Sequence, residues 1–94
     1  MPTGPSTKQR TRFWVYVLGS KRKLDRRTYV GWTTDLERRL TRHNTGNGAK
    51  STRGRQWVLL YSECWATKRK AMSREWYIKR DRSFRKKLRE AGLI

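Results

Sequence analysis

The run at residues 12–19 limits the possible folds more than any other part of this sequence, because it is apolar on both faces of an extended chain. It reads RFWVYVLG, so that Phe, Val and Val alternate with Trp, Tyr and Leu. A strand with two apolar faces has to be covered on both sides. We therefore expect this run to form the central strand of a small sheet.

The other segments carry start and stop signals. Thr34 and Glu37 match the first and last positions of a capping box, which predicts a helix with Thr34 as its N-cap. The short spacing between the first two apolar runs indicates a hairpin. The expected elements are, in chain order, a strand at 12–19, a basic turn at 20–27, a strand at 28–32, a helix from 34 to about 44 that ends near Gly46, a loop at 45–55, a strand at 56–65, a helix at 67–80 and a short basic helix at 82–91.

The chain has 94 residues and a formal net charge of +18. This length has room for one core, and we expect a flexible basic tail at 1–11, a folded domain at 12–91 and a short C-terminal end at 92–94. Arginine outnumbers lysine, and arginine is suited to binding phosphate. The expected partner is a polyanion, with nucleic acid well ahead of an anionic membrane surface.

Several protein classes are excluded at this level. No stretch approaches the apolar length of a membrane span, and the N-terminus has no apolar core of a secretory signal. The single cysteine, Cys64, excludes a disulfide framework and a cysteine-rich zinc site. These features predict an intracellular protein that is neither secreted nor embedded in a membrane.

Polar side chains are expected on the inner faces of both longer helices. At 100° per residue, His43 falls in the middle of the apolar stripe of the first helix, Arg39 falls on its edge, and Arg38 points to solvent. In the second helix, Glu75 falls in the centre of a face that includes Met72 and Trp76. An inward carboxylate must be paired, protonated or bound to a metal.

Two tyrosines add to this set. Tyr16 and Tyr29 lie on neighbouring strands, and a hairpin can bring them to one face, although the register is not determined by the sequence. With Arg39, His43 and Glu75 they gather where the sheet meets the helices. Phosphodiester hydrolysis needs a group that positions or deprotonates water, a cation and a divalent metal on a carboxylate. This set can supply all three, and one carboxylate suits a single-metal mechanism.

The same residues belong to an ordered series of motifs. The series is Trp14-Val15-Tyr16, Tyr29-Val30-Gly31, Thr33-Thr34-Asp35-Leu36-Glu37-Arg38-Arg39-Leu40, His43-Asn44, Gly46-Asn47-Gly48-Ala49-Lys50, Thr52-Arg53-Gly54, Ala71, Glu75 and Lys79. In this order and spacing the chain resembles the GIY-YIG nuclease domain, specifically its small stand-alone YhbQ-like (UPF0213-type) group. The resemblance covers about residues 12–90. It implies an α+β fold, with a three-stranded antiparallel sheet flanked by helices in the order β-β-α-β-α-α.

The resemblance also implies a DNA endonuclease that depends on Mg²⁺ or Mn²⁺. Tyr29 would act as general base or orient the attacking water, and Tyr16 would bind or orient the scissile phosphate or the water. Arg39 would stabilise the transition state, and His43 would hydrogen-bond the phosphate or a tyrosine hydroxyl. Glu75 would be the sole protein ligand of the metal.

Further residues are candidates for contact with nucleic acid. An exposed tryptophan can stack on a base, and loop cations can contact backbone phosphates. The candidates are Trp32, Arg42, Lys50, Arg53, Arg55 and Lys79. So small a domain predicts low sequence specificity, with a preference for single-stranded, nicked or branched DNA in repair or recombination. A protein partner can supply further specificity.

Two other functions remain open from the sequence. The first is a nucleic-acid-binding module that kept the fold and lost cleavage, for which charge and aromatic residues are sufficient. The second is an RNA-associated basic protein. Binding with a steep salt dependence and no cleavage under any metal condition would indicate the first, and competition between DNA and RNA at one salt concentration would separate the second.

Overall fold

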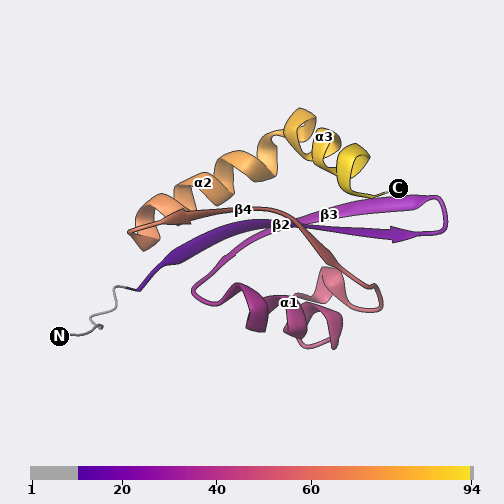
Figure 1. The fold of residues 1–94 in the computed structure, drawn as a ribbon, viewed down its shortest axis with the longest axis horizontal. Coiled ribbons are helices and arrows are strands. Elements are labelled where there is room, and N and C mark those ends of the chain that lie inside the picture. Colours follow the sequence, from indigo (N-terminus) through magenta and orange to yellow (C-terminus); the bar gives the residue numbers. More distant parts are fainter. Residues whose placement is uncertain (1–10, 94) are drawn as a thin grey trace.

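The computed structural model describes residues 11–93, which form one sheet with helices on both of its faces (Figure 1). The elements are β2 (Phe13–Arg22), β3 (Asp25–Thr33), α1 (Leu36–Asn44), the short 3₁₀ helix η1 (Lys50–Thr52), β4 (Val58–Trp65), α2 (Lys68–Arg80) and α3 (Arg82–Gly92). The α+β class and the order β-β-α-β-α-α are confirmed, with η1 as an addition. The expected flexible tail lies, apart from Thr11, outside the described residues.

The first apolar run is the central strand, as predicted. The sheet order is β3-β2-β4, and β2 pairs antiparallel with both neighbours. Helix α1 covers one face of the sheet, while α2 and α3 cover the other (Figure 1). Both faces of β2 are therefore buried, which is why this strand carries apolar side chains at every position of its middle section.

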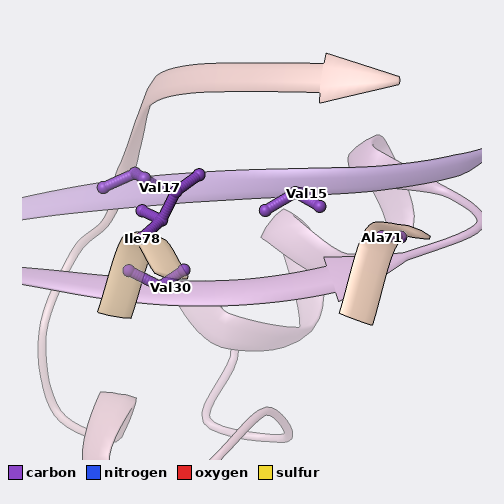
Figure 2. Packing of buried hydrophobic residues seen from close by; sticks show 5 residues of the cluster. All are labelled: Val15, Val17, Val30, Ala71 and Ile78. Carbon is purple, nitrogen blue, oxygen red and sulfur yellow. The ribbon is translucent and has the colours of Figure 1, made fainter. Parts of the chain in front are cut away.

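The core on the α2 side is a compact group of aliphatic side chains. Val15, Val17 and Val30 project from the sheet toward Ala71 and Ile78 of α2 (Figure 2). Burial of an aliphatic side chain of the Val or Ile size stabilises the fold by about 1.5–3 kcal/mol. This cluster fixes the position of α2, the helix that carries Glu75.

The hairpin between β2 and β3 is longer than predicted. Residues 20–27 were expected to form a basic turn, but the strands continue to Arg22 and from Asp25, which leaves a two-residue turn at Lys23 and Leu24. The extension is held from outside the hairpin by Arg55. Its guanidinium donates to the Ser20 hydroxyl at 3.1 Å and to Asp25 Oδ2 at 3.0 Å. Polar residues therefore form strand here because a distant side chain binds them.

Two element boundaries also differ from the prediction. The N-cap of α1 is Asp35 rather than Thr34, because Asp35 Oδ1 accepts from the Arg38 N–H at 3.1 Å. Strand β3 continues to Thr33, whose hydroxyl accepts from the Asp35 N–H at 3.1 Å, so the helix starts one residue later. None of the helices within residues 11–93 is both long and apolar enough to cross a membrane.

Candidate active site

The register of the hairpin brings the two tyrosines together. Tyr16 pairs with Gly31, and Leu18 pairs with Tyr29, so both tyrosines lie on the face covered by α1. Their ring centroids are 6.4 Å apart. A Cβ at Gly31 would lie 2.5 Å from the Tyr16 hydroxyl oxygen, so the glycine leaves room for the Tyr16 side chain to lie across β3.

His43 is buried beside these tyrosines, in the middle of the inward stripe of α1 as predicted. Its Nε2 lies 3.0 Å from the Tyr16 hydroxyl, and its ring centroid is 4.8 Å from that of Tyr29. On its other side, Nδ1 lies 2.9 Å from the hydroxyl of Thr52. His43 therefore connects the tyrosine pair to η1.

The direction of this hydrogen-bond chain follows from its last member. The Thr52 hydroxyl donates to the carbonyl oxygen of Ala49 at 2.8 Å. Because the Thr52 proton is used there, Thr52 Oγ1 accepts from His43 Nδ1–H. Burial lowers the pKa of His43, and the cations Arg39 and Arg42 lower it further. In the neutral ring Nε2 is then an acceptor, and it accepts a hydrogen bond from the Tyr16 hydroxyl.

His43 predicts a specific dependence of stability on pH. The pKa of His43 is lowered in the folded protein, while the unfolded chain binds a proton near pH 6.5, so the free energy of unfolding should fall as the pH drops below about 7. The slope can reach about 1.4 kcal/mol per pH unit. Urea unfolding at a series of pH values measures it.

The matched variant for this measurement is His43→Gln, which removes the only histidine and should remove the slope between about pH 5 and 7. Asp25 and Glu63 also have lowered pKa values, but carboxylates titrate below about pH 4.5 in the unfolded chain. An identical slope in His43→Gln would contradict the assignment.

Arg39 and Glu75 act electrostatically on both tyrosines. Burial raises the pKa of Tyr16, the neighbouring Tyr29 and Glu75 raise it further, and Arg39 opposes them. The pKa of Tyr29 is raised by burial and then by Glu75, while Arg39 again lowers it. One cation and one carboxylate thus influence the same two hydroxyls. Direct contacts join Tyr16, Tyr29 and His43, while Arg39 and Glu75 act on them through charge, so the five-residue site stays a prediction.

Arg39 is half-buried, and within residues 11–93 its guanidinium has no hydrogen-bond or ion-pair partner. It lines a pocket of about 260 Å³ together with Arg38 and Arg42, at the point where β3 ends and α1 begins. Three arginines around one small pocket form a site suited to an anion.

Glu75 lies at the margin of the inward face of α2 rather than in its centre. The buried residues of α2 are Ala71 and Ile78, while Met72 and Trp76 are 47% and 51% exposed. Only the side of the predicted face that carries Ala71 and Ile78 packs against the sheet, so Glu75 lies at the boundary with solvent. Its Oε2 lies 3.7 Å from Lys79 Nζ, and its side chain is 21% exposed.

A second carboxylate, Glu63 of β4, holds α2 in place. Its oxygens accept hydrogen bonds from Tyr61 at 2.6 Å, from Trp65 at 2.6 Å and from Arg74 Nε at 2.6 Å. Burial alone would raise the pKa of Glu63, but these bonds from Arg74, Tyr61 and Trp65 keep it below its ordinary value. Arg74 precedes Glu75, so this network fixes the rotation of α2 beside the site.

We expect Glu63→Gln to lower the free energy of unfolding by about 1–2 kcal/mol, because an amide cannot accept all of these bonds. Most of the loss should come from Tyr61 and Trp65, since Arg74 is more exposed and its ion pair contributes little. Chemical denaturation measures the change. The matched control is the exposed Glu37→Gln on α1, which should change stability by less than about 0.5 kcal/mol; equal effects would contradict the role of Glu63.

The donor set around Glu75 suits one type of metal site. Within the described part of the chain no three His, Cys, Asp or Glu residues form a cluster that could hold a metal ion. Mg²⁺ keeps several water ligands and is often bound through one or two carboxylates together with substrate phosphates. The partly exposed Glu75 carboxylate fits that arrangement, with water and phosphate oxygens as the other ligands.

Comparison with known proteins identifies the family. The model of the GIY-YIG catalytic domain matches residues 12–89. The chain belongs to the GIY-YIG family. A UPF0213 protein of Clostridium perfringens is 52% identical over 68 residues, which are 71% of this chain and 70% of that protein. A UPF0213 protein of Streptococcus agalactiae is 46% identical over 81 residues, or 85% and 82% of the two chains.

A solved relative has also been found. The solution NMR structure of a UPF0213 protein from Bacillus halodurans is 35% identical and superimposes with a TM-score of 0.49, covering 86% of this chain and 85% of that protein. The resemblance to the small stand-alone UPF0213-type group is thus confirmed by the sequence relatives.

The predicted contact residues of this GIY-YIG domain lie in several places. Arg42 lines the arginine pocket. Lys50 is exposed at the start of η1, and Arg53 lines a groove of about 600 Å³ at the hairpin tip. Lys79 is ion-paired with Glu75.

One of these predictions needs correction. Arg55 was expected to contact phosphate, but its side chain is only 5% exposed, and its guanidinium is used within the hairpin, including bonds to the Ser20 and Asp25 carbonyl oxygens. Trp32 is partly buried and packs against the Val15 and Val17 cluster, with Lys68 Nζ 5.5 Å from its ring centroid. Stacking of a base on Trp32 stays a prediction.

Thr52 and Glu63 are the positions whose importance was missed. In the sequence Thr52 is one residue of the loop motif, and nothing distinguishes its hydroxyl from that of its neighbour Ser51. In the structure Thr52 is fully buried, whereas Ser51 is exposed. Glu63 lies between Tyr61 and Trp65 on one face of an apolar strand. A carboxylate on an apolar face is the same pattern that identified Glu75.

Proposed function

We propose that this protein is a divalent-metal-dependent DNA endonuclease that hydrolyses phosphodiester bonds with low sequence specificity. Membership in the GIY-YIG family supports a nuclease-type function. One observation carries the proposal to these residues: the Tyr16 hydroxyl lies 3.0 Å from His43 Nε2, with the Tyr29 ring beside that imidazole at a centroid distance of 4.8 Å, on the sheet face covered by α1, where Arg39 lines a pocket. A phosphodiester needs this combination of groups at one point.

In this proposal the two tyrosines orient the attacking water, and Tyr16 accepts its proton. The Tyr16 hydroxyl donates a hydrogen bond to His43 Nε2, so its oxygen is left to accept a hydrogen bond from water. The pKa of Tyr29 is raised mainly by burial, so its hydroxyl stays protonated near neutral pH and orients the water or phosphate. As the water oxygen bonds to phosphorus and the ester oxygen leaves, the water proton passes to the Tyr16 oxygen and the Tyr16 proton passes to His43 Nε2.

Charge stabilisation comes from the other two residues. Arg39 faces the position of the phosphate with an uncommitted guanidinium, which can stabilise the charge that develops on its oxygens. Glu75 would hold Mg²⁺ or Mn²⁺. When bound, this ion would neutralise charge on the phosphate and lower the pKa of a water ligand.

The expected substrate follows from the cationic surface. Contacts to phosphate carry no direct information about base sequence. This supports a nuclease that selects its substrate by the structure of the DNA and not by its sequence. Single-stranded, nicked and branched DNA in repair or recombination are the candidates. We further propose an intracellular location, with RNA as a competing ligand and a protein partner as a further source of specificity.

A cleavage assay tests the proposal. Labelled single-stranded, duplex, nicked and branched DNA are incubated with the protein in Mg²⁺, in Mn²⁺ and in EDTA, beside Glu75→Gln and the control Glu37→Gln. We expect cleavage that needs metal, is at least about a hundredfold slower in Glu75→Gln and is unchanged in Glu37→Gln. Full activity in Glu75→Gln would end the proposal, and binding without cleavage in every lane would favour the non-catalytic module.

A further inference from the structure

The outward face of α2 exposes large apolar side chains in the middle of a basic surface. Met72, Trp76 and Tyr77 are 47%, 51% and 59% exposed. Single exposed apolar residues are ordinary on protein surfaces, but these three lie within two turns of one helix. Trp76 was expected to face the core, and its exposure is not explained by packing within the described residues.

The Trp76 indole is held in place from within α2. The Arg80 guanidinium carbon lies 3.8 Å from its ring centroid, and Arg80 Nη1 also donates to the Trp76 carbonyl oxygen at 3.0 Å. The Tyr77 ring lies against the indole at a centroid distance of 5.0 Å. A fixed aromatic surface with a cation beside it loses little conformational entropy when a ligand binds.

The charge around this surface indicates what binds there. The cations of α2 are Lys68, Arg69, Lys70, Arg74, Lys79 and Arg80, and Glu75 is its only acidic residue. Cations that follow a phosphate backbone, combined with aromatic rings on which bases stack, are typical of surfaces that bind single strands. A second copy of this chain would bring the same cations together, and they would repel.

Trp76 also lies next to the candidate active site. It follows Glu75 directly and is rotated from it by about 100° around the helix. A strand with its phosphate at Arg39 and Glu75 therefore passes close to the indole.

We propose that Trp76, supported by Arg80, is a stacking site for an unpaired base of the DNA strand held in the active site. This inference rests on the proposed function for the identity of the ligand. It adds a base contact to a surface whose other contacts are to phosphate, and it selects strands in which a base near the bound phosphate is free to leave the stack.

Binding in EDTA tests the stacking separately from cleavage. The probes are a labelled oligothymidylate and an abasic strand of the same length, at one fixed salt concentration. We expect Trp76→Ala to lower affinity for the oligothymidylate about tenfold, Trp76→Phe to retain most of it, and both to bind the abasic strand like the wild type. Leu24→Ala, which removes a 97% exposed apolar side chain from the hairpin tip, is the matched control and should leave both affinities unchanged.

Indole N–H signals in NMR spectra provide a second readout. The Trp76 signal, assigned by its loss in Trp76→Phe, should shift when the oligothymidylate is added but not with the abasic strand. Equal affinities in all variants, or equal losses on both probes, would overturn the stacking site while leaving DNA binding intact. If the wild-type protein does not cleave DNA in the presence of metal, that result contradicts the proposed function but not the stacking site, which is measured by binding in EDTA.

Discussion

Arg39→Ala is expected to slow DNA cleavage at saturating DNA by at least about a hundredfold. Arg38→Ala, which removes an exposed arginine from the rim of the same pocket, should weaken DNA binding and slow this rate by less than about tenfold. The two substitutions remove the same charge from adjacent positions of α1. Arg39 is half-buried beside the tyrosines, whereas Arg38 is exposed. The difference between the cleavage rates of the two variants therefore reports the position of the Arg39 cation and not the total positive charge of the surface.

Initial rates at saturating DNA are the appropriate measurement, because they report the reaction after binding. Arg39→Lys keeps the charge but loses the planar donor group, so we expect it to recover only part of the rate. Denaturation curves of the three variants should match the wild type, since the Arg39 side chain has no ion pair to lose within the described residues. Equal rates for Arg38→Ala and Arg39→Ala would contradict a specific role for Arg39.

Thr52→Val is expected to destabilise the fold by about 1–3 kcal/mol and to disturb the tautomer of His43. Valine has the shape of threonine without the hydroxyl, so the buried His43 Nδ1–H loses its acceptor and the Ala49 carbonyl loses a donor. With Nδ1 unsatisfied, the proton can move to Nε2, which then no longer accepts from Tyr16. Cleavage should fall with the share of molecules in the wrong tautomer.

Nitrogen NMR of the imidazole gives the direct readout, because protonated and unprotonated ring nitrogens have distinct shifts and His43 is the only histidine. The wild type should show Nδ1 protonated and Nε2 free. Thr52→Ser keeps a hydroxyl and should restore this pattern, while Ser51→Ala removes the neighbouring exposed hydroxyl and should change nothing. A wild-type pattern in Thr52→Val would show that Thr52 does not set the tautomer.

Periodicity predicted the buried residues correctly where burial depends on the pattern within a single strand or helix. The central position of β2 follows from its two apolar faces, and the inward position of His43 follows from its spacing to Leu36 and Leu40, which pack on the same cluster as Tyr16. Glu75 was predicted too far inward because Met72 and Trp76 were counted as core. Periodicity locates an apolar face but not the part of it that a neighbour covers.

The sequence by itself determined the order of the strands and helices, the two covered faces of β2, the inward side of α1, and the ordered motifs that identify the GIY-YIG family. These depend on local geometry, with a period of two residues in strands and 3.6 in helices. Only the tertiary structure decided the register that joins Tyr16 to Gly31, the internal use of Arg55 and the direction of the chain from Tyr16 through His43 to Thr52. Each of these depends on which distant segment packs against the residue, and no local pattern contains that information.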